Sequence, residues 1–165
     1  MRYSPAALAL SLLVAVSASG SFAGETRADP RAVALETQGR AALAAGDTQA
    51  AIDAFEAALV VDPSYSALYV DLADAARAEG LQGKAIRYYR EAQERDPKNI
   101  AAISGEGEAL LERGAVEKAR ANLAKLEDLC GGDCAATRQL AAAIANGPRM
   151  LTAEAGSADR PVAQN

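Results

Sequence analysis

The stretch Ala32–Asn99 decides the fold, because its two halves carry the same pattern. Ala32–Tyr65 reads AVALETQGRAALAAGDTQAAIDAFEAALVVDPSY, and Ser66–Asn99 reads SALYVDLADAARAEGLQGKAIRYYREAQERDPKN. When Ala32 is aligned with Ser66, the landmark pairs are Gly39 with Ala73, Gly46 with Gly80, Ala51 with Ala85, Phe55 with Tyr89, Ala58 with Ala92 and Pro63 with Pro97. A repeat of 34 residues with this pattern predicts stacked helical hairpins.

Each half reads as two helices separated by a glycine turn. In the first half, apolar residues recur at helical spacing over Ala32–Ala45 and again over Ala50–Val61. Gly46 suits the left-handed turn that ends a helix, and Asp47 suits the cap of the next helix. Asp62-Pro63 ends the second helix, because proline disfavours α geometry in the residue before it.

A third copy, which matches the pattern less closely, follows 34 residues after the second. Gly107, Gly114 and Ala119 keep the small residues of the pattern. Leu123, Leu126 and Gly131 stand at the later landmark positions, where the first two copies have an aromatic residue, an alanine and a proline. The sequence therefore predicts three hairpins, the last of them degenerate towards its end.

These residues resemble the tetratricopeptide repeat family. The first two copies match all six consensus positions, and the third copy matches the first three. Leu35, Tyr69 and Ile103 stand where the family prefers Trp. The resemblance covers Ala32 to Cys134 and implies an all-α, right-handed α-solenoid that binds a protein or peptide partner. The family binds many unrelated partners, so the resemblance does not name one.

The remaining chain completes the predicted domain plan. The segments are a signal peptide at 1–23, a linker at 24–31, repeats at 32–65, 66–99 and 100–133, a capping helix at 134–146 and a disordered tail at 147–165. The capping helix carries Leu140, Ala141 and Ile144 on one face, and we expect it to cover Leu123 and Leu126 of the third repeat. The tail is predicted to be disordered because it holds few large apolar residues.

Residues 1–23 have the features of an export signal. Arg2 provides a positive start, Ala6–Val16 is an apolar run, and Ser21-Phe22-Ala23 fits a small-x-small cleavage site. Cleavage is expected after Ala23, with Ala18 and Gly20 as alternatives and an uncleaved anchor also left open. The apolar run is too short to span a bilayer comfortably. The predicted location is therefore the periplasm, or outside the cell.

Composition argues against catalysis, cofactors and nucleic acid. The formal charge is −5, and Lys and Arg are scattered rather than gathered into a basic stripe. The chain has no histidine, which removes the commonest general base and a frequent metal ligand. Gly105-Glu106-Gly107 lacks the glycine spacing and the lysine of a phosphate-binding loop. We therefore expect a non-enzymatic chain without a cofactor or a metal site.

The family resemblance implies a partner-binding groove lined by the first helix of each pair. The predicted groove residues are Glu36, Arg40, Val70, Asp71, Asp74, Arg77, Glu108 and Glu112. Acids outnumber bases there, which favours a partner segment bearing Lys or Arg beside apolar side chains. The competing interpretation is that these acids form a solvated helix face of an acidic protein, and the sequence leaves both open.

Cys130 and Cys134 are the only cysteines, and they bracket Gly131-Gly132-Asp133. Because export leads to an oxidising compartment, a disulfide is expected. Closing so short a loop adds about 2 kcal/mol in the chain-entropy model. The spacing differs from the C-x-x-C pattern of redox-active pairs.

Taken together, these features predict a non-catalytic interaction module of the bacterial cell envelope, acting as an adaptor or scaffold. The alternative is a periplasmic chaperone or an accessory subunit of a secretion or pilus assembly complex. Homo-oligomerisation is left open, because helical stacks with exposed ends can self-associate.

Overall fold

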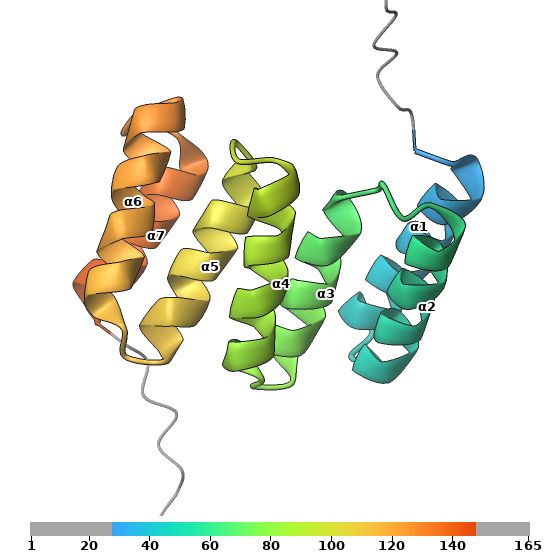
Figure 1. The fold of residues 1–165 in the computed structure, drawn as a ribbon. Coiled ribbons are helices and arrows are strands. Elements are labelled where there is room, and N and C mark those ends of the chain that lie inside the picture. Colours follow the sequence, from blue (N-terminus) through green and yellow to red (C-terminus); the bar gives the residue numbers. More distant parts are fainter. Residues whose placement is uncertain (1–27, 148–165) are drawn as a thin grey trace, which may run out of the picture.

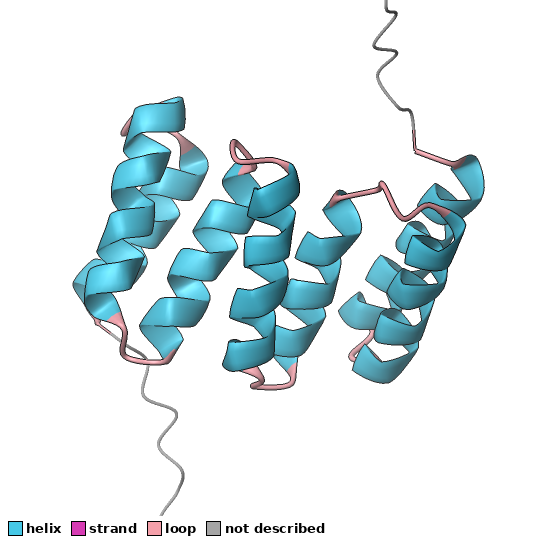
Figure 2. Ribbon diagram, viewed as in Figure 1, coloured by secondary structure: helices cyan, strands magenta, loops and turns pink. Residues whose placement is uncertain are grey.

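The structure is a computed structural model that describes residues 28–147, and over that range it consists of helices and loops only (Figure 2). The helices are α1 (Pro30–Ala44), α2 (Thr48–Val61), α3 (Ala67–Ala78), α4 (Gln82–Arg95), α5 (Ile100–Glu112), α6 (Val116–Cys130) and α7 (Ala135–Asn146). They stack in chain order, with α1 and α7 at opposite ends of the row (Figure 1). The predicted all-α solenoid is confirmed.

The first helix begins at Pro30, two residues before the predicted repeat boundary. The Asp29 side chain caps it by accepting a hydrogen bond from the Arg31 backbone N–H at 2.8 Å, and proline suits the first helical position. The Asp29 backbone N–H in turn donates to the Asp62 carboxylate at 3.0 Å. This bond ties the start of the stack to the Asp-Pro turn that ends the first hairpin.

Glycine makes the turn inside each hairpin, as the sequence predicts. Gly46, Gly80 and Gly114 have φ between 74° and 82°, a left-handed conformation that glycine adopts at little cost. After the first of these turns, the Asp47 side chain caps α2 by accepting from the Ala50 N–H at 3.1 Å. Local sequence alone therefore sets these helix ends.

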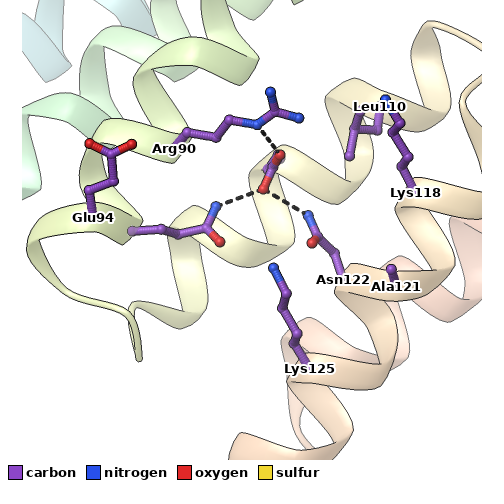
Figure 3. A pocket seen from close by; sticks show the side chains of 9 residues that line it. Arg90, Glu94, Leu110, Lys118, Ala121, Asn122 and Lys125 are labelled. Atoms are coloured by element: carbon purple, nitrogen blue, oxygen red, sulfur yellow. Dashed lines mark hydrogen bonds and ion pairs between the residues drawn. The ribbon is translucent and has the colours of Figure 1, made fainter.

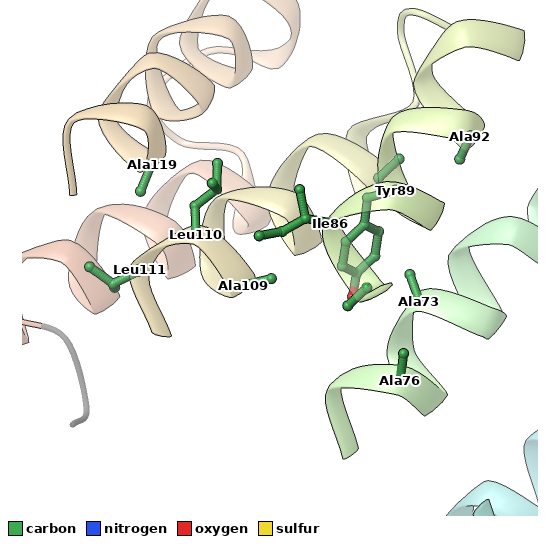
Figure 4. Close-up of a cluster of buried hydrophobic side chains, with 11 residues drawn as sticks. Ala73, Ala76, Ile86, Tyr89, Ala92, Ala109, Leu110, Leu111 and Ala119 are labelled. Carbon is green, nitrogen blue, oxygen red and sulfur yellow. The ribbon is translucent and has the colours of Figure 1, made fainter. Parts of the chain in front are cut away.

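Large side chains from the second helices fill the space that small residues leave open. A β-carbon added at Gly39 would lie 2.4 Å from the Phe55 ring, and one at Gly105 would lie 2.4 Å from the Tyr89 ring. Phe55 and Tyr89 are fully buried. Figure 4 shows Tyr89 among the alanines between α3 and α5. Tyr89 thus fastens the second hairpin to the third.

The last helix, α7, packs on the third hairpin through Leu140, which is fully buried with Ile103 and Leu126. A β-carbon at Gly107 would lie 2.5 Å from a methyl carbon of Leu140. Leu123, which was expected to be covered by this helix, is half-buried against the same cluster. The helix therefore takes the place of the first helix of a fourth pair. The predicted signal peptide, the first half of the linker (24–27) and the tail beyond Gly147 lie outside the described residues.

Candidate functional site

The first helices of the pairs, together with α7, form what we call the inner face. All eight residues predicted to bind a partner lie on its helices. Glu36 and Arg40 are on α1, Val70, Asp71, Asp74 and Arg77 are on α3, and Glu108 and Glu112 are on α5. The structure brings most of them together as ion pairs that cross from one repeat to the next.

Arg40 joins the first repeat to the second. Its guanidinium lies 2.7 Å from the Glu36 carboxylate, and its Nε donates to Asp71 at 2.8 Å. The carboxylate side chains of Glu36 and Asp71 are only 6% and 7% exposed. The Tyr65 hydroxyl donates a further hydrogen bond to Glu36 at 2.5 Å. These two acids are buried and paired, so they belong to neither a solvated face nor a free acidic surface.

Burial shifts the titration of this cluster. Burial raises the pKa of Asp71 to about 6, although the hydrogen bonds from Arg40 act in the opposite direction. Burial, followed by the hydrogen bond to Glu36, raises the pKa of Tyr65 to about 12. Protonation of Asp71 in mildly acidic solution would therefore neutralise its ion pair with Arg40.

Arg77 repeats this arrangement between the second and third repeats. Its Nη1 lies 2.9 Å from Glu108, and its Nη2 lies 2.6 Å from Glu112. The amide of Gln139 on α7 donates to Glu108 at 2.7 Å. The cluster of Arg77, Glu108 and Glu112 therefore has a net charge of −1. The side chain of Glu112 is 31% exposed.

The other two predicted residues have different surroundings. Asp74 is exposed and accepts a hydrogen bond from the hydroxyl of Tyr89, which reaches it from α4. Burial, followed by the charge of Asp74, raises the pKa of Tyr89 above its usual value. Val70 is half-buried against the central core and offers part of an apolar side chain on the inner face.

A cavity of about 700 Å³ opens beside the Arg77 cluster. Charged and amide groups on its wall come from Arg77, Glu108, Glu112, Gln82, Gln139 and Asn146, and apolar groups come from Ala78, Leu111, Ala142 and Ala143. The cavity therefore offers apolar surface beside a small excess of negative charge. A segment with one basic and one apolar side chain would match both features.

The α7 residues of this cavity were not predicted, because the helix was expected only to cap the third repeat. The signal that identifies them is Ala141, which follows Gly107 by one full repeat and continues the series of small residues in the first helices. That register places α7 beside α5, where Gln139, Ala142 and Ala143 extend the inner face.

Cys130 and Cys134 form a disulfide between the end of α6 and the start of α7, with Cα atoms 5.7 Å apart. No group of three or more potential metal ligands occurs within residues 28–147. In the same range, none of the helices has the length and apolarity that crossing a membrane requires.

Comparison with known proteins identifies the repeat. Residues 36–100 match a family model described as tetratricopeptide repeat. Residues 36–100 therefore carry repeats of the tetratricopeptide repeat (TPR) type, and the predicted resemblance to that family is confirmed. Such repeats are modules for protein–protein interaction. No curated protein matches the chain by sequence.

Several solved TPR structures are similar to this chain. The Sgt2 TPR domain from Aspergillus fumigatus has a TM-score of 0.65 and 28% identity, covering 72% of this chain and 80% of that one. The Yersinia enterocolitica type III secretion chaperone SycD, in complex with a peptide of the translocator YopD, has a TM-score of 0.60 and 21% identity, covering 69% and 86%. The TPR2B domain of yeast Sti1, in complex with pHsp70, has a TM-score of 0.60 and 20% identity, covering 72% and 98%.

Proposed function

We propose that this TPR protein is an exported, non-catalytic adaptor that binds a segment of a partner protein on its inner face. The observation that carries the proposal is the cavity beside Arg77, Glu108 and Glu112. Its wall combines apolar side chains with a net negative charge, and α7 extends it beyond the three repeats. The preferred segment carries a Lys or Arg next to an apolar side chain.

Peptide binding by similar structures supports this proposal. The SycD and Sti1 structures contain a YopD peptide and pHsp70, respectively. The two matches cover 69% and 72% of this chain. The ion pairs of Arg40 and Arg77 fix the inner helices relative to one another, which would reduce the ordering cost when a segment binds.

Export to the periplasm is part of the proposal. It rests on the signal-like residues 1–23 and on the disulfide between Cys130 and Cys134, a bond typical of oxidising compartments. Fractionation of the native host, with mass spectrometry of the N-terminus, tests it directly. We expect a periplasmic protein that begins at Gly24, and a cytoplasmic protein with an intact N-terminus would refute export.

Partner binding is tested by crosslinking and recovery of tagged protein from the native host. Ala142→Trp would fill the cavity, because Ala142 is exposed and lines it. Ala145→Trp is the matched control, since Ala145 is exposed on the same helix and is not on the cavity wall. We expect Ala142→Trp to lose the specific partner and Ala145→Trp to retain it. Equal recovery with both variants would place binding elsewhere.

The second candidate is a periplasmic chaperone or an accessory subunit of a secretion or pilus assembly complex. The specific observation in its favour is the similarity to SycD, a type III secretion chaperone of Yersinia enterocolitica. The two functions differ in stoichiometry. An adaptor forms a fixed complex with one or two proteins, whereas a chaperone at equimolar ratio suppresses aggregation of several unrelated clients.

A further inference from the structure

A second cavity, of about 440 Å³, lies on a different side of α5 from the inner face. It is bounded by α4, α5 and α6 (Figure 3). Its charged and polar lining residues are Arg90, Gln93, Glu94, Glu106, Lys118, Asn122 and Lys125, and its apolar ones are Leu110 and Ala121. None of these residues was predicted to bind a partner.

A buried carboxylate organises this cavity. The side chain of Glu106 is 6% exposed and accepts three hydrogen bonds: from Arg90 Nε at 2.7 Å, from Gln93 Nε2 at 2.8 Å and from Asn122 Nδ2 at 3.1 Å. Burial acts to raise the pKa of Glu106, but these hydrogen bonds outweigh it and hold the pKa below its usual value. The network fixes the orientation of the three donor side chains.

The preceding repeat shows that the fold does not need this network. One full repeat before Glu106, Gln93 and Asn122 stand Leu72, Leu59 and Tyr88, respectively. All three pack in the hydrophobic core, with Leu72 only 3% exposed. Replacing a buried charged cluster with apolar residues of similar size is often neutral or stabilising. Apolar residues at these three positions would stabilise the fold equally well. A role in binding explains why Gln93, Glu106 and Asn122 are polar instead.

The network leaves several groups free to meet a ligand. Asn122 is 4% exposed, yet its side-chain oxygen accepts no hydrogen bond from any described residue, and the same is true of the Gln93 side-chain oxygen. The Nη groups of Arg90 donate no hydrogen bond within residues 28–147.

Two lysines add positive charge to this cavity. Lys118 and Lys125 form no ion pair with the described part of the chain. They are two of only four lysines in a protein of net charge −5. Figure 3 shows Lys125 pointing towards the centre of the cavity near Asn122, and Lys118 beside Leu110. Glu94 is the one exposed acid on the wall.

We propose that this cavity binds an acidic segment of a polypeptide. Carboxylates of the segment pair with Lys118, Lys125 and the Nη groups of Arg90, and its backbone N–H groups donate to the free oxygens of Gln93 and Asn122. Opposite charge with bidentate geometry at the guanidinium makes such contacts favourable. The inference does not depend on the inner face, because the two cavities share no lining residue.

A titration followed by NMR tests this proposal with defined probes. Isotope-labelled protein from Gly24 onward is titrated with a blocked tetraglutamate peptide and with a blocked tetraglutamine peptide as the neutral control. We expect saturable shifts of the Gln93 and Asn122 side-chain amides with tetraglutamate only. We expect the double variant Lys118→Glu/Lys125→Glu to weaken binding by tenfold or more, which is about 1.4 kcal/mol.

The matched control is Lys84→Glu/Lys98→Glu, which makes the same change in net charge on the other two lysines and should weaken binding less than about twofold. A triple variant, Gln93→Leu/Glu106→Leu/Asn122→Tyr, copies the preceding repeat. It should abolish the tetraglutamate-induced shifts of the backbone amides of Leu110 and Ala121, which line the same cavity, while keeping the helical spectrum. The proposal is overturned if tetraglutamate gives no saturable shift up to about 10 mM. It is equally overturned if both lysine double variants weaken binding to the same extent.

Discussion

The contact between Gly107 on α5 and Leu140 on α7 decides whether α7 belongs to the stack. Leu140 is fully buried, and a methyl group at residue 107 would lie 2.5 Å from its side chain. Leu140→Ala removes the bulky side chain, and Gly107→Ala adds a methyl group at the same point. The double variant should therefore lose less unfolding free energy than the sum of the losses of the two single variants.

The magnitudes follow from packing. Leu140→Ala should cost about 3 kcal/mol of unfolding free energy, as expected for a buried leucine. Gly107→Ala should cost about 2 kcal/mol through overpacking, less about 1 kcal/mol gained from the helix propensity of alanine. Additive effects would therefore give a loss of about 4 kcal/mol for the double variant. We expect about 2 kcal/mol instead, because the new methyl group occupies the vacated space.

Urea unfolding followed by circular dichroism measures this coupling in the four proteins of the cycle. The control cycle pairs Leu140→Ala with Gly105→Ala, because Gly105 faces the Tyr89 ring instead of Leu140. We expect the control cycle to be additive. The packing of α7 described above is refuted if the Gly107 cycle is also additive within about 0.5 kcal/mol.

Three further predictions test the rest of the stack. Burial raises the folded-state pKa of Asp71 to about 6, so the contribution of Asp71 to stability falls as pH rises from about 4 to about 6. Arg40→Met should therefore cost about 2 kcal/mol near pH 7.5 and less near pH 5, where Asp71 is largely protonated and only the ion pair of Arg40 with Glu36 is lost, as measured by urea unfolding at both pH values. Phe55→Ala should cost about 3–5 kcal/mol in the same assay, because the ring is fully buried, and a loss below about 1 kcal/mol would contradict its place in the core. The double variant Cys130→Ser/Cys134→Ser should cost about 2 kcal/mol, and a reducing agent should destabilise the parent protein but not this variant.

Helix positions could be predicted because their signals are local. The glycine turns at Gly46 and Gly80 and the Asp-Pro stop at Asp62 act through the backbone of neighbouring residues, so a single chain read in order reveals them. The predicted capping helix, 134–146, differs from α7 by one residue at its start. The start of α1 was placed two residues late, because the cap of Asp29 lies before the repeat pattern begins.

The contacts of the candidate site on the inner face were only partly predictable. The family resemblance placed Glu36, Asp71 and Glu108 on the first helices of the pairs, and each does lie on such a helix. Spacing within a helix cannot show that an arginine from one repeat meets carboxylates of the next. That pairing requires the stacking distance between hairpins, which only packing sets.

The sequence by itself determined the repeat, its helices and the family, because these depend on a regular repeat period and on local turn chemistry. Only the tertiary structure decided the pairing of the inner-face acids and the position of α7 as the first helix of a fourth pair. The structure likewise gathered Arg90, Glu106 and Asn122 from three helices around one cavity. The physical reason is that contacts between helices arise from the complementary shapes of side chains far apart in the chain, and no single stretch of sequence contains both partners.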